Sequence, residues 1–354
     1  MANIAVDARP LSQPIAGIAR YTYEILSRLT SHQKHNWFLY SNAPIKQKFE
    51  NSTVRIAPEL FRNSLICSQF MFPYWAQKDS IESFWAPRHH LPILLRSPSV
   101  LSIHDLAWKI VPDTMPSPRR LQESLLMPRS IAKASKVAPV SFATKQQIEE
   151  HWPQPANKME VVTPGCMTFN TASEKPHSRP YILIVGTIEP RKNHYLALKA
   201  FRHIAAEIDH DLIIAGRMGW GNIDLSSAIS SNGLQKRVKV VYDPEDNILA
   251  SYYEHADYLL SPSIYEGFDL PVLEAMTHGT PVLASDTQIH REVAGPAARY
   301  FSPDEPALTE TLATALSDAN IRTSIAKHCR PQAEHYSWDR SSLQILELLE
   351  EISA

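Results

Sequence analysis

Short apolar runs alternate with amphipathic segments along the chain, and this alternation constrains the fold more than any other feature. The runs are three to five residues long and rich in Val, Ile and Leu, as is usual for strands buried on both faces. The segments between them repeat apolar residues with a helical period. We therefore predict an α/β fold in which helices cover both faces of parallel sheets. The predicted strands are Asn3–Val6, Trp37–Tyr40, Val54–Ala57, Ser83–Ala86, Val100–His104, Val137–Val140, Met159–Val162, Tyr181–Val185, Asp211–Ala215, Val238–Val241, Tyr258–Ser261 and Val282–Ala284. The predicted helices include Ile18–Leu29, Arg119–Ala134, Tyr195–Ala206, Asn247–His255 and Glu305–Leu316.

The length of the chain and one polar segment indicate two domains. A chain of 354 residues exceeds what one hydrophobic core usually supports. Asn170–Pro180 holds two prolines and no apolar run, which is the composition of a linker. We predict an N-terminal domain over 1–172 and a C-terminal domain over 181–337. Each would be a Rossmann-like, doubly wound parallel sheet, and the two would face each other across a cleft.

The apolar pattern of the last segment, 338–354, predicts one further helix. Leu343, Leu346, Leu349 and Ile352 recur every three residues, which places them on one helical face. The sequence leaves open whether this helix crosses back to the N-terminal domain.

Glycine is scarce in the first half of the chain, because Gly17 is the only glycine before Gly165. That half therefore cannot form the G-x-G-x-x-G turn of dinucleotide-binding folds. The phosphate loop G-x-x-x-x-G-K-[ST] occurs nowhere in the sequence. These absences argue against a nicotinamide dehydrogenase and a P-loop kinase.

Charge is divided unevenly between the two halves. Residues 1–172 hold 19 basic and 12 acidic residues, a balance of +7, whereas the remainder holds 16 and 25, a balance of −9. A basic half can meet a polyanion or an anionic membrane, although two domains can also simply differ in isoelectric point. The three cysteines form no C-x-x-C pair, so we expect neither a zinc site nor a disulfide framework, and a reducing cytosol fits.

The longest uncharged apolar stretch, Asn63–Gln77, is too short to span a membrane. We favour a core helix in which Leu65, Phe70 and Trp75 pack inward. The alternative is an aromatic surface that touches lipid headgroups.

Two loops at predicted strand ends carry residues suited to chemistry, because ligands of open parallel sheets bind there. After the strand Tyr181–Val185 comes Gly-Thr-Ile-Glu-Pro-Arg-Lys-Asn, and Arg191 and Lys192 then stand at a helix start. Two cations beside free backbone N–H groups suit a diphosphate. A solvated pair of surface cations is the simpler alternative for this loop alone.

The second loop follows the strand Tyr258–Ser261. Glu266 lies on this loop, Gly267 lets backbone approach a ligand, and Pro271 marks the first turn of a helix that includes Glu274. Two carboxylates and nearby amides can bind the hydroxyl groups of a ribose and a hexose. A capped helix with surface glutamates is the alternative reading of this loop alone.

Together the loops resemble those of retaining glycosyltransferases of the family 4 type, which have the GT-B fold. The resemblance rests on EPRKN at 189–193 and YEGFDLPVLEAM at 265–276, with its Glu-x7-Glu spacing. It extends to Asp-Leu-Ile-Ile-Ala-Gly-Arg at 211–217 and to the opening turn Ala-Gly-Ile-Ala-Arg-Tyr at 16–21. Phe-Trp-Ala-Pro-Arg-His-His-Leu-Pro at 84–92 and Ile-His-Asp-Leu at 103–106 resemble the bacterial branch that builds surface polysaccharides and O-antigen, with its mannosyl- and rhamnosyltransferases.

The resemblance implies a role for each matching residue. Arg191 and Lys192 would neutralise the diphosphate of a sugar nucleotide, so that no metal and no cofactor is required. Glu266 would contact the donor sugar, and Glu274 would bind the nucleotide ribose. His104 would reach across the cleft to the transferred sugar. The further donor-site residues implied are Gly17, Gly186, Gly216, Tyr242, Gly267, Phe268, Asp269 and Leu270, and those weakly implied for the acceptor are Arg88, His89 and His90.

Two positions depart from the family's pattern. Asp269 stands where a glycine is usual, so a carboxylate lies close to the expected diphosphate pocket. The Asp269 side chain must point away from this pocket, cap the helix at Pro271, or contact the donor sugar. Ala19 replaces the second glycine of the opening turn and narrows its backbone conformations.

The sequence therefore predicts a retaining enzyme that transfers a hexose from a nucleoside diphosphate, with a GDP-hexose such as GDP-mannose favoured. The acceptor would be a growing glycan, carried on a membrane lipid, and nucleic acid is not an expected partner. The basic first domain favours peripheral contact with anionic lipid, which would place the enzyme in the cytoplasm at the inner face of the membrane. The alternatives are a sugar-nucleotide epimerase on the same scaffold and a non-catalytic nucleotide-sugar-binding protein.

Overall fold

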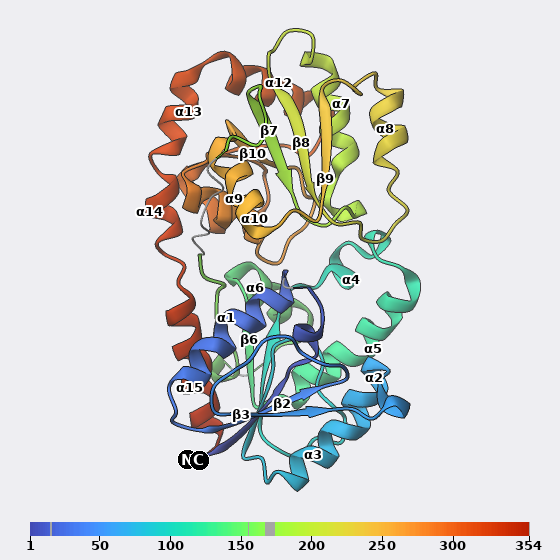
Figure 1. Ribbon diagram of the computed structural model, residues 1–354, viewed down its shortest axis with the longest axis vertical. Coiled ribbons are helices and arrows are strands. Elements are labelled where there is room, and N and C mark those ends of the chain that lie inside the picture. The colour runs from blue at the N-terminus through green and yellow to red at the C-terminus, as the bar shows by residue number, and fades with distance from the viewer. Residues whose placement is uncertain (15, 155, 167–173, 354) are drawn as a thin grey trace. The chain divides into compact units, whose positions relative to one another are not determined.

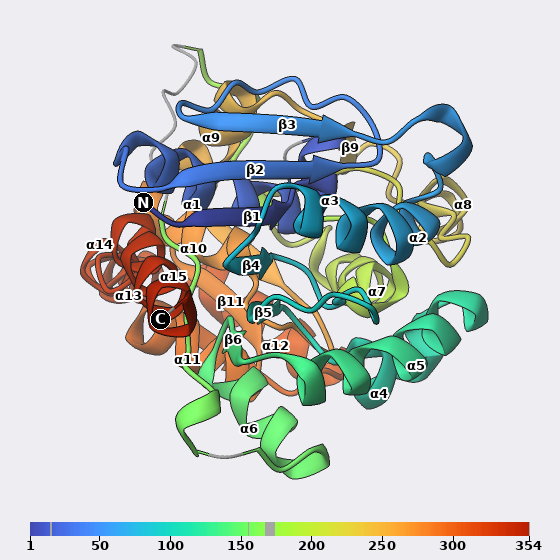
Figure 2. The same ribbon diagram turned by 90° about the horizontal axis from the view of Figure 1, so that it is seen from below.

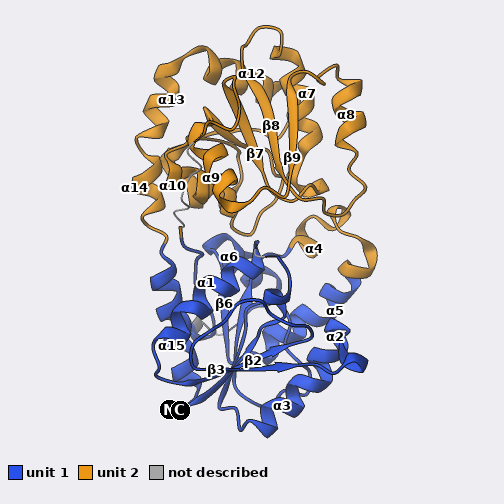
Figure 3. Cartoon of the chain, viewed as in Figure 1, with its two compact units in different colours: residues 1–106, 121–165, 337–354 blue, residues 107–120, 166–336 orange. Residues whose placement is uncertain are grey.

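The computed structural model describes residues 1–14, 16–154, 156–166 and 174–353, and Figure 1 shows its helices and strands. The chain forms two compact units, coloured separately in Figure 3. The first unit comprises residues 1–106, 121–165 and 337–354, and the second comprises residues 107–120 and 166–336. The predicted domain end at 172 and the first part of the predicted linker, 170–173, lie outside the described residues.

One segment differs from the predicted domain division. Residues 107–120, which we predicted in the first domain, belong to the second unit. Side-chain contacts to Trp220 explain this grouping. Its Nε1 donates to the carbonyl oxygen of Thr114 at 2.7 Å, and the Arg119 guanidinium lies 4.7 Å from the centre of its ring system.

The first unit contains a parallel sheet of six strands in the order β3-β2-β1-β4-β5-β6. The central strands β1 and β4 are buried along nearly their whole length, whereas the edge strand β3 is mostly exposed. The strands are β1 (Asn3–Asp7), β2 (Asn36–Ser41), β3 (Ser52–Ile56), β4 (Ser83–Ala86), β5 (Ser99–Ile103) and β6 (Lys136–Pro139). The helices and turns of this part of the chain are η1 (Arg9–Ser12), α1 (Ile18–Ser31), η2 (Glu59–Phe61), α2 (Ser64–Ile66), η3 (Cys67–Met71), α3 (Phe72–Lys78), α5 (Ser117–Lys133, whose first four residues belong to the second unit), α6 (Phe142–His151), η5 (Ala156–Lys158) and α15 (Trp338–Ser353).

The C-terminal helix α15 belongs to the first unit, where it packs on α1, β4, β5 and β6. Its buried face holds Ile345, Leu346, Leu348 and Leu349. The predicted face was therefore partly wrong, since Leu343 is exposed. A spacing of three drifts around a helix of 3.6 residues per turn, so the pattern could not keep one face.

The second unit contains another parallel sheet of six strands, in the order β12-β11-β10-β7-β8-β9. Its core joins β7, β8 and β10 to α7, α8 and α12 through residues such as Ile184, Phe201 and Leu308. The strands are β7 (Tyr181–Val185), β8 (Asp211–Gly216), β9 (Val238–Tyr242), β10 (Tyr258–Ser261), β11 (Val282–Ser285) and β12 (Ala298–Phe301). The helices and turns are α4 (Ala107–Ile110), η4 (Pro112–Thr114), η6 (Pro190–Lys192), α7 (His194–Ile204), α8 (Leu225–Ser231), α9 (Asp246–His255), α10 (Leu270–His278), α11 (Gln288–Ala294), η7 (Gly295–Ala297), α12 (Glu305–Ser317), α13 (Ala319–Ala326) and α14 (Cys329–Ala333).

Each sheet has one place where the strand order reverses. In the first unit the reversal lies between β1 and β4, and in the second between β7 and β10. The loops that follow these strand pairs diverge to opposite faces of the sheet, which opens a crevice at their carboxyl ends. The two motif-bearing loops of the second half follow β7 and β10, so the fold brings them to the same crevice.

The structure differs from the predicted strands at two places. Met159–Val162 runs beside β6, and Glu160 N and Val162 N donate to the carbonyl oxygens of Val137 and Pro139. It forms only an isolated bridge rather than a strand, because Pro139 has no N–H to donate in return. Strand β12 was missed, and its mixed burial explains why the apolar pattern there is weak.

The apolar segment 63–77 is helical, as we favoured, but it is not a regular helix and only part of it is buried. It divides into α2, the π-helical turn η3, and α3. Trp75 is buried as expected, whereas Leu65 and Phe70 are exposed. A π-turn holds more residues per turn than an α-helix, so Phe70 within the turn and Leu65 before it do not keep the face predicted from the α-helical period.

Candidate active site

The candidate site lies at the carboxyl ends of β7, β8, β9 and β10 in the second unit. Gly186 follows β7, and Gly216 ends β8 beside Tyr242 at the end of β9. Gly216 has a φ of +157°, and a Cβ there would lie 1.9 Å from the carbonyl oxygen of Gly186. Only glycine allows these two strand ends to approach so closely, which leaves backbone rather than side chain at this edge of the sheet.

Arg191 lies in the turn η6 and is held by carboxylates on both sides. Its Nε and one Nη donate to Glu189 Oε1 at 2.9 and 2.5 Å. Its other Nη donates to the carbonyl oxygen of Tyr265 at 2.8 Å and to Glu266. Burial raises the pKa of Glu189, and the positive charge of Arg191 opposes that rise. The guanidinium therefore links the loop after β7 to the loop after β10.

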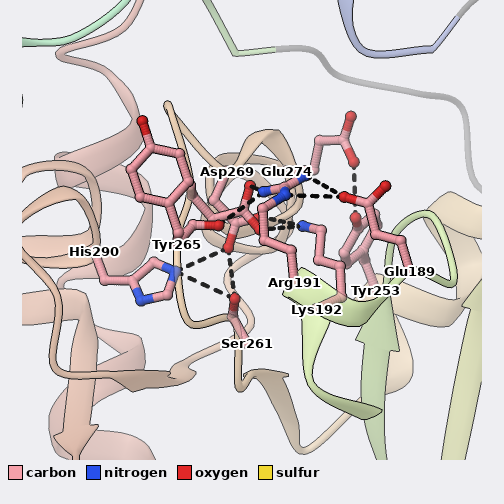
Figure 4. Close-up of polar contacts among 10 residues, drawn as sticks. Glu189, Arg191, Lys192, Tyr253, Ser261, Tyr265, Asp269, Glu274 and His290 are labelled. Atoms are coloured by element: carbon pink, nitrogen blue, oxygen red, sulfur yellow. Dashed lines mark hydrogen bonds and ion pairs between the residues drawn. The ribbon is translucent and has the colours of Figure 1, made fainter. Parts of the chain in front are cut away.

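Lys192 is buried and lies between two carboxylates of the second loop. Its Nζ is 2.8 Å from Glu266 Oε1 and 3.0 Å from Asp269 Oδ1. Burial acts to lower the pKa of Lys192, but the negative charges of Asp269 and Glu266 outweigh it, so the pKa is raised. The ammonium group is therefore charged and fixed in place. Figure 4 shows Arg191 and Lys192 side by side within this cluster.

Asp269 adopts a left-handed backbone with a φ of +68°, the conformation that explains why glycine is usual here. Its carboxylate is buried, and it accepts hydrogen bonds from Lys192 and, at 2.5 Å, from Ser261 Oγ. The side chain makes no capping hydrogen bond to the described residues of α10, so the capping option was wrong. It points toward the cations and not away from them.

His290 holds the other side of the Asp269 carboxylate. Its Nε2 lies 3.1 Å from Asp269 Oδ2, and its Nδ1 donates to the carbonyl oxygen of Ser285 at 2.7 Å. Burial acts to raise the pKa of Asp269. Lys192 and the hydrogen bonds from His290 and Ser261 outweigh burial and hold that pKa well below its usual range. Asp269 is therefore a charged anchor for the Lys192 ammonium (Figure 4).

Glu274 lies in α10 and is half-buried. Its Oε2 accepts a hydrogen bond from the Tyr253 hydroxyl at 2.7 Å, which fixes the carboxylate. Burial and the charge of Glu274 raise the pKa of Tyr253 well above its ordinary value, so the phenol stays protonated as the donor.

The remaining predicted donor residues lie at the carboxyl ends of the strands of the same sheet, with different exposures. Phe268 is buried and packs edge-on against Tyr336, with ring centroids 5.3 Å apart, so it supports the loop. Gly267 is buried and Leu270 half-buried, and Tyr242 is 56% exposed at the end of β9. The structure brings these residues to one edge of the sheet, and their contacts to a donor stay predictions.

Gly17 precedes α1 in the first unit and has a φ of +50°. A Cβ there would meet no atom within 4 Å among the described residues, so conformation rather than space calls for glycine. Its approach to a diphosphate stays a prediction.

His104 follows β5 and is held by two hydrogen bonds. Its Nε2 donates to the carbonyl oxygen of Pro87 at 2.7 Å, and its backbone N donates to His89 Nε2 at 3.1 Å. Burial, with the nearby His89, lowers the pKa of His104 to about 4, so the ring is neutral near pH 7. Its contact with a transferred sugar stays a prediction.

Glu123 of α5 organises the histidines of the loop after β4. Its Oε2 is 2.8 Å from His90 Nε2 and 3.6 Å from His89 Nδ1. Burial acts to raise the pKa of Glu123, but the two histidines outweigh it and hold the pKa well below its usual range. Glu123, His89 and His104 therefore form one connected chain, and Arg88 is half-buried beside it.

Sequence reasoning missed several of these residues. Glu189 stands within the EPRKN motif and could have been noticed there. Glu123, Ser261, Tyr253 and His290 lie on other elements, and nothing in their local pattern marks them as partners of the site.

Comparison with known proteins finds one matching family model and several similar enzymes. Residues 168–332 match the family model of glycosyl transferases group 1. The chain is 25% identical to O-antigen chain mannosyltransferase B of Escherichia coli over 375 positions, which cover 97% of this chain and 98% of that protein. It is 26% identical to O-antigen chain mannosyltransferase RfbU of Salmonella typhimurium over 67% of each protein.

Solved structures give the fold. Sucrose-phosphate synthase from Thermosynechococcus elongatus superposes with a TM-score of 0.78 at 18% identity over 99% of both chains. Anabaena Alr3699/HepE in complex with UDP-glucose superposes with a TM-score of 0.77 at 17% identity, over 99% of this chain and 100% of that one. The chain is a glycosyltransferase with the GT-B fold, and its residues 168–332 match the family model of glycosyl transferases group 1.

Proposed function

We propose that this glycosyltransferase retains the anomeric configuration, requires no metal, and transfers mannose from a GDP-hexose to a lipid-linked glycan of the O-antigen type. The two mannosyltransferases described above support the sugar and the glycan class. The relative that was solved with UDP-glucose supports a sugar nucleotide as the donor for this fold. Nucleic acid is not a proposed partner.

One observation carries the proposal. Arg191 and Lys192 after β7 meet Glu266 and Asp269 after β10 in a single ion-pair cluster, at the place where the strand order reverses. Two fixed cations at such a crevice suit a diphosphate, and adjacent carboxylates suit the hydroxyl groups of the attached sugar.

The proposed step breaks the bond between the anomeric carbon and the β-phosphate oxygen. The acceptor hydroxyl attacks that carbon from the same face and forms the new glycosidic bond, while its proton passes to the departing phosphate. Arg191 and Lys192 stabilise the negative charge that develops on the diphosphate. Glu189 keeps hold of Arg191 and Asp269 keeps hold of Lys192, so the two cations need not be repositioned when that charge appears.

The two glutamates would bind different parts of the donor. Glu266 would release part of its contact with Arg191 and Lys192 and accept hydrogen bonds from the sugar hydroxyls. Glu274, which Tyr253 holds in place, would accept those of the ribose. Gly216 and Tyr242 would border the base.

The enzyme would act in the cytoplasm at the inner face of the membrane, where a lipid-linked acceptor is reached. Within the residues that the structure describes, no helix has the length and apolar character needed to cross a bilayer. Peripheral contact through the first unit is the proposed mode of attachment, because residues 1–172 hold 19 basic and 12 acidic residues.

Product analysis tests this proposal. The full chain is incubated in EDTA with GDP-mannose and a mannoside acceptor, and the products are separated and analysed by NMR. We expect free GDP and a glycoside with the donor's anomeric configuration. An epimerised sugar still attached to GDP, or an inverted product, would contradict the proposal.

A further inference from the structure

Asp269 joins Lys192 to a buried histidine, His290, which has no part in the proposed transfer step. Asp269 Oδ1 lies 3.0 Å from Lys192 Nζ, and Asp269 Oδ2 lies 3.1 Å from His290 Nε2. Figure 4 shows Lys192 and His290 on opposite sides of the Asp269 carboxylate. The exposed fraction of His290 is 0%, so any effect that its ring has on a donor passes through Asp269.

The second sheet directs His290 toward this carboxylate. Strands β10 and β11 are neighbours, and α11, which follows β11, lies beside α10 (Figure 2). Thr287 Oγ1 accepts a hydrogen bond from His290 N at 3.3 Å, and the Tyr300 hydroxyl donates to the carbonyl oxygen of His290 at 3.3 Å. The backbone of His290 is therefore held at both its N–H and its carbonyl group, which fixes the position of the ring.

The partners of the His290 ring require a proton on each of its two nitrogens. Nδ1 lies 2.7 Å from the carbonyl oxygen of Ser285, an atom that can only accept. Nε2 faces Asp269 Oδ2 at 3.1 Å and Ser261 Oγ at 3.3 Å. Ser261 gives its one hydroxyl hydrogen to the ionised Asp269 carboxylate, so both of these oxygens also accept from Nε2. His290 is therefore an imidazolium.

The charge of this imidazolium completes the balance of the donor cluster. Three carboxylates of the cluster contact three cations. The carboxylates are those of Glu189, Glu266 and Asp269, and the cations are Arg191, Lys192 and His290. With a neutral ring at position 290, the carboxylates of this set would outnumber its cations. A diphosphate would then bind beside surplus negative charge, in an interior where charges are weakly screened.

Asp269 fixes Lys192 at a cost that His290 offsets. The φ of +68° at Asp269 is a conformation that glycine adopts more readily, and burial disfavours an ionised carboxyl group. Lys192 alone could balance this carboxylate, but the charge of the ammonium would then be cancelled by Asp269 and Glu266 together. Because His290 balances Asp269, the ammonium is oriented without losing its attraction for an anion.

We propose that His290 is a positioning residue of the donor site. Its imidazolium balances Asp269, so that Asp269 can fix Lys192 while Lys192 keeps its positive charge for the diphosphate of the donor. This inference rests on the proposed function, which supplies that diphosphate. The Asp269–His290 pair thus acts as one neutral unit that orients the ammonium group of Lys192.

Nuclear magnetic resonance tests the protonation of His290 without any substrate. The full chain is labelled with ¹⁵N-histidine, and its ring nitrogens are observed at pH 7. The signals of His290 are those that disappear in His290→Gln. We expect both ring nitrogens to carry a proton. A ring with one protonated and one bare nitrogen would overturn the inference.

Isothermal titration calorimetry tests the effect on the diphosphate. GDP and UDP are titrated into wild type, and the nucleotide that binds more tightly is used for the variants. His290→Gln keeps an amide that can donate to Asp269 but removes the positive charge. We expect it to bind the nucleotide roughly tenfold more weakly, because one unbalanced charge acts on the diphosphate through a weakly screened interior. The matched control is His203→Gln, which removes an exposed histidine paired with Glu305 and should bind as wild type does.

A double variant separates a charge effect from a purely structural one. Asp269→Gly combined with His290→Leu removes both charges of the pair, and glycine suits the left-handed backbone at position 269. We expect this double variant to bind the nucleotide severalfold more tightly than His290→Gln, because its carboxylates and cations are equal in number again. If His290 only supported the loop, removal of both side chains would weaken binding further.

The results distinguish this inference from the proposed function. Equal nucleotide binding by wild type and a folded His290→Gln, or weaker binding by the double variant than by His290→Gln, would overturn the inference even if sugar transfer is observed. Melting temperatures establish that each variant is folded. Absence of transfer from every sugar nucleotide would instead overturn the proposed function, and the ring protonation and the nucleotide binding would still decide the inference.

Discussion

The substitution Asp269→Asn tests the physical basis of the donor site. It keeps the size of a buried side chain and removes its charge. The carboxylate lies 3.0 Å from Lys192 Nζ, 2.5 Å from Ser261 Oγ and 3.1 Å from His290 Nε2. An amide of the same shape can accept with only one oxygen, and its NH2 group would face at least one donor.

The expected cost follows from these contacts. A hydrogen bond to a charged group contributes about 1.5–3 kcal/mol and a neutral one about 0.5–1.5 kcal/mol. Two weakened contacts therefore lower the free energy of unfolding by about 2 kcal/mol. Breaking a buried ion pair outright costs about 3–5 kcal/mol, but Glu266 still balances Lys192, so we expect a total of about 2–4 kcal/mol.

Differential scanning calorimetry of the full chain measures this effect. For a unit of this size each kcal/mol shifts the melting temperature by roughly 2–4 °C, so the transition of the second unit should fall by about 4–16 °C. The matched control is Asp286→Asn, which breaks an exposed ion pair with Arg291 and should change stability by less than about 1 kcal/mol. Equal, small shifts in both variants would refute the reasoning.

The effect of Asp269→Asn on stability should also depend on pH. The pKa of Asp269 is lowered on folding, so its contribution is fully present above the ordinary aspartate pKa of about 3.9. It is lost as the pH falls through the lower, folded value. The difference in melting temperature between wild type and Asp269→Asn should therefore be constant from pH 7 to pH 5 and should shrink below pH 4.

Three further predictions concern other parts of the molecule. His194 is buried, neither ring nitrogen has a hydrogen-bond partner among the described residues, and burial lowers its pKa to about 4. The unfolded chain binds a proton at this histidine near pH 6.5, so wild type loses stability as the pH falls toward 4. In urea titrations, the free energy of unfolding of His194→Leu relative to wild type should therefore rise by about 2 kcal/mol from pH 7 to pH 5. A difference between the two proteins that stays constant over this range would contradict the prediction. His104 stays neutral down to about pH 4, so transfer should show no loss attributable to its protonation between pH 7 and pH 5, and His104→Asn should keep the shape of that profile at a lower rate. Tyr253→Phe removes the hydrogen bond that the Tyr253 hydroxyl donates to the Glu274 carboxylate, so it should raise KM for the donor several-fold and leave kcat within about twofold. A fall in kcat alone would count against the ribose role.

The sheet architecture could be predicted from the sequence, because strands that are buried on both faces consist of continuous runs of apolar residues. Eleven of the predicted strands have counterparts in the two sheets. The predictions that were wrong failed for local reasons that the apolar pattern of the sequence does not show. Pro139 interrupts a ladder that the apolar run 159–162 would otherwise complete, and the π-turn η3 rotates Leu65 and Phe70 into the open.

The positions of the site residues could be predicted because strand order brings the ends of β7 and β10 together. The ion pairs that these residues form with one another could not be predicted. Sequence shows Arg191 and Lys192 as solvated cations or phosphate ligands, whereas the structure shows them engaged by three carboxylates. Asp269 illustrates the point, since its carboxylate is held by Lys192 and by His290, which lie 77 and 21 residues away in the sequence.

Release of GDP from GDP-mannose, with and without a mannoside acceptor, tests the central claim most directly. Wild type should release GDP and glycosylate the acceptor in equal amounts. Lys192→Ala and Glu266→Ala should each lower kcat/KM at least a hundredfold, about 2.7 kcal/mol of transition-state stabilisation, while Asp286→Asn matches wild type. Turnover at wild-type rates in Lys192→Ala and Glu266→Ala would contradict the assignment of the active site to this ion-pair cluster.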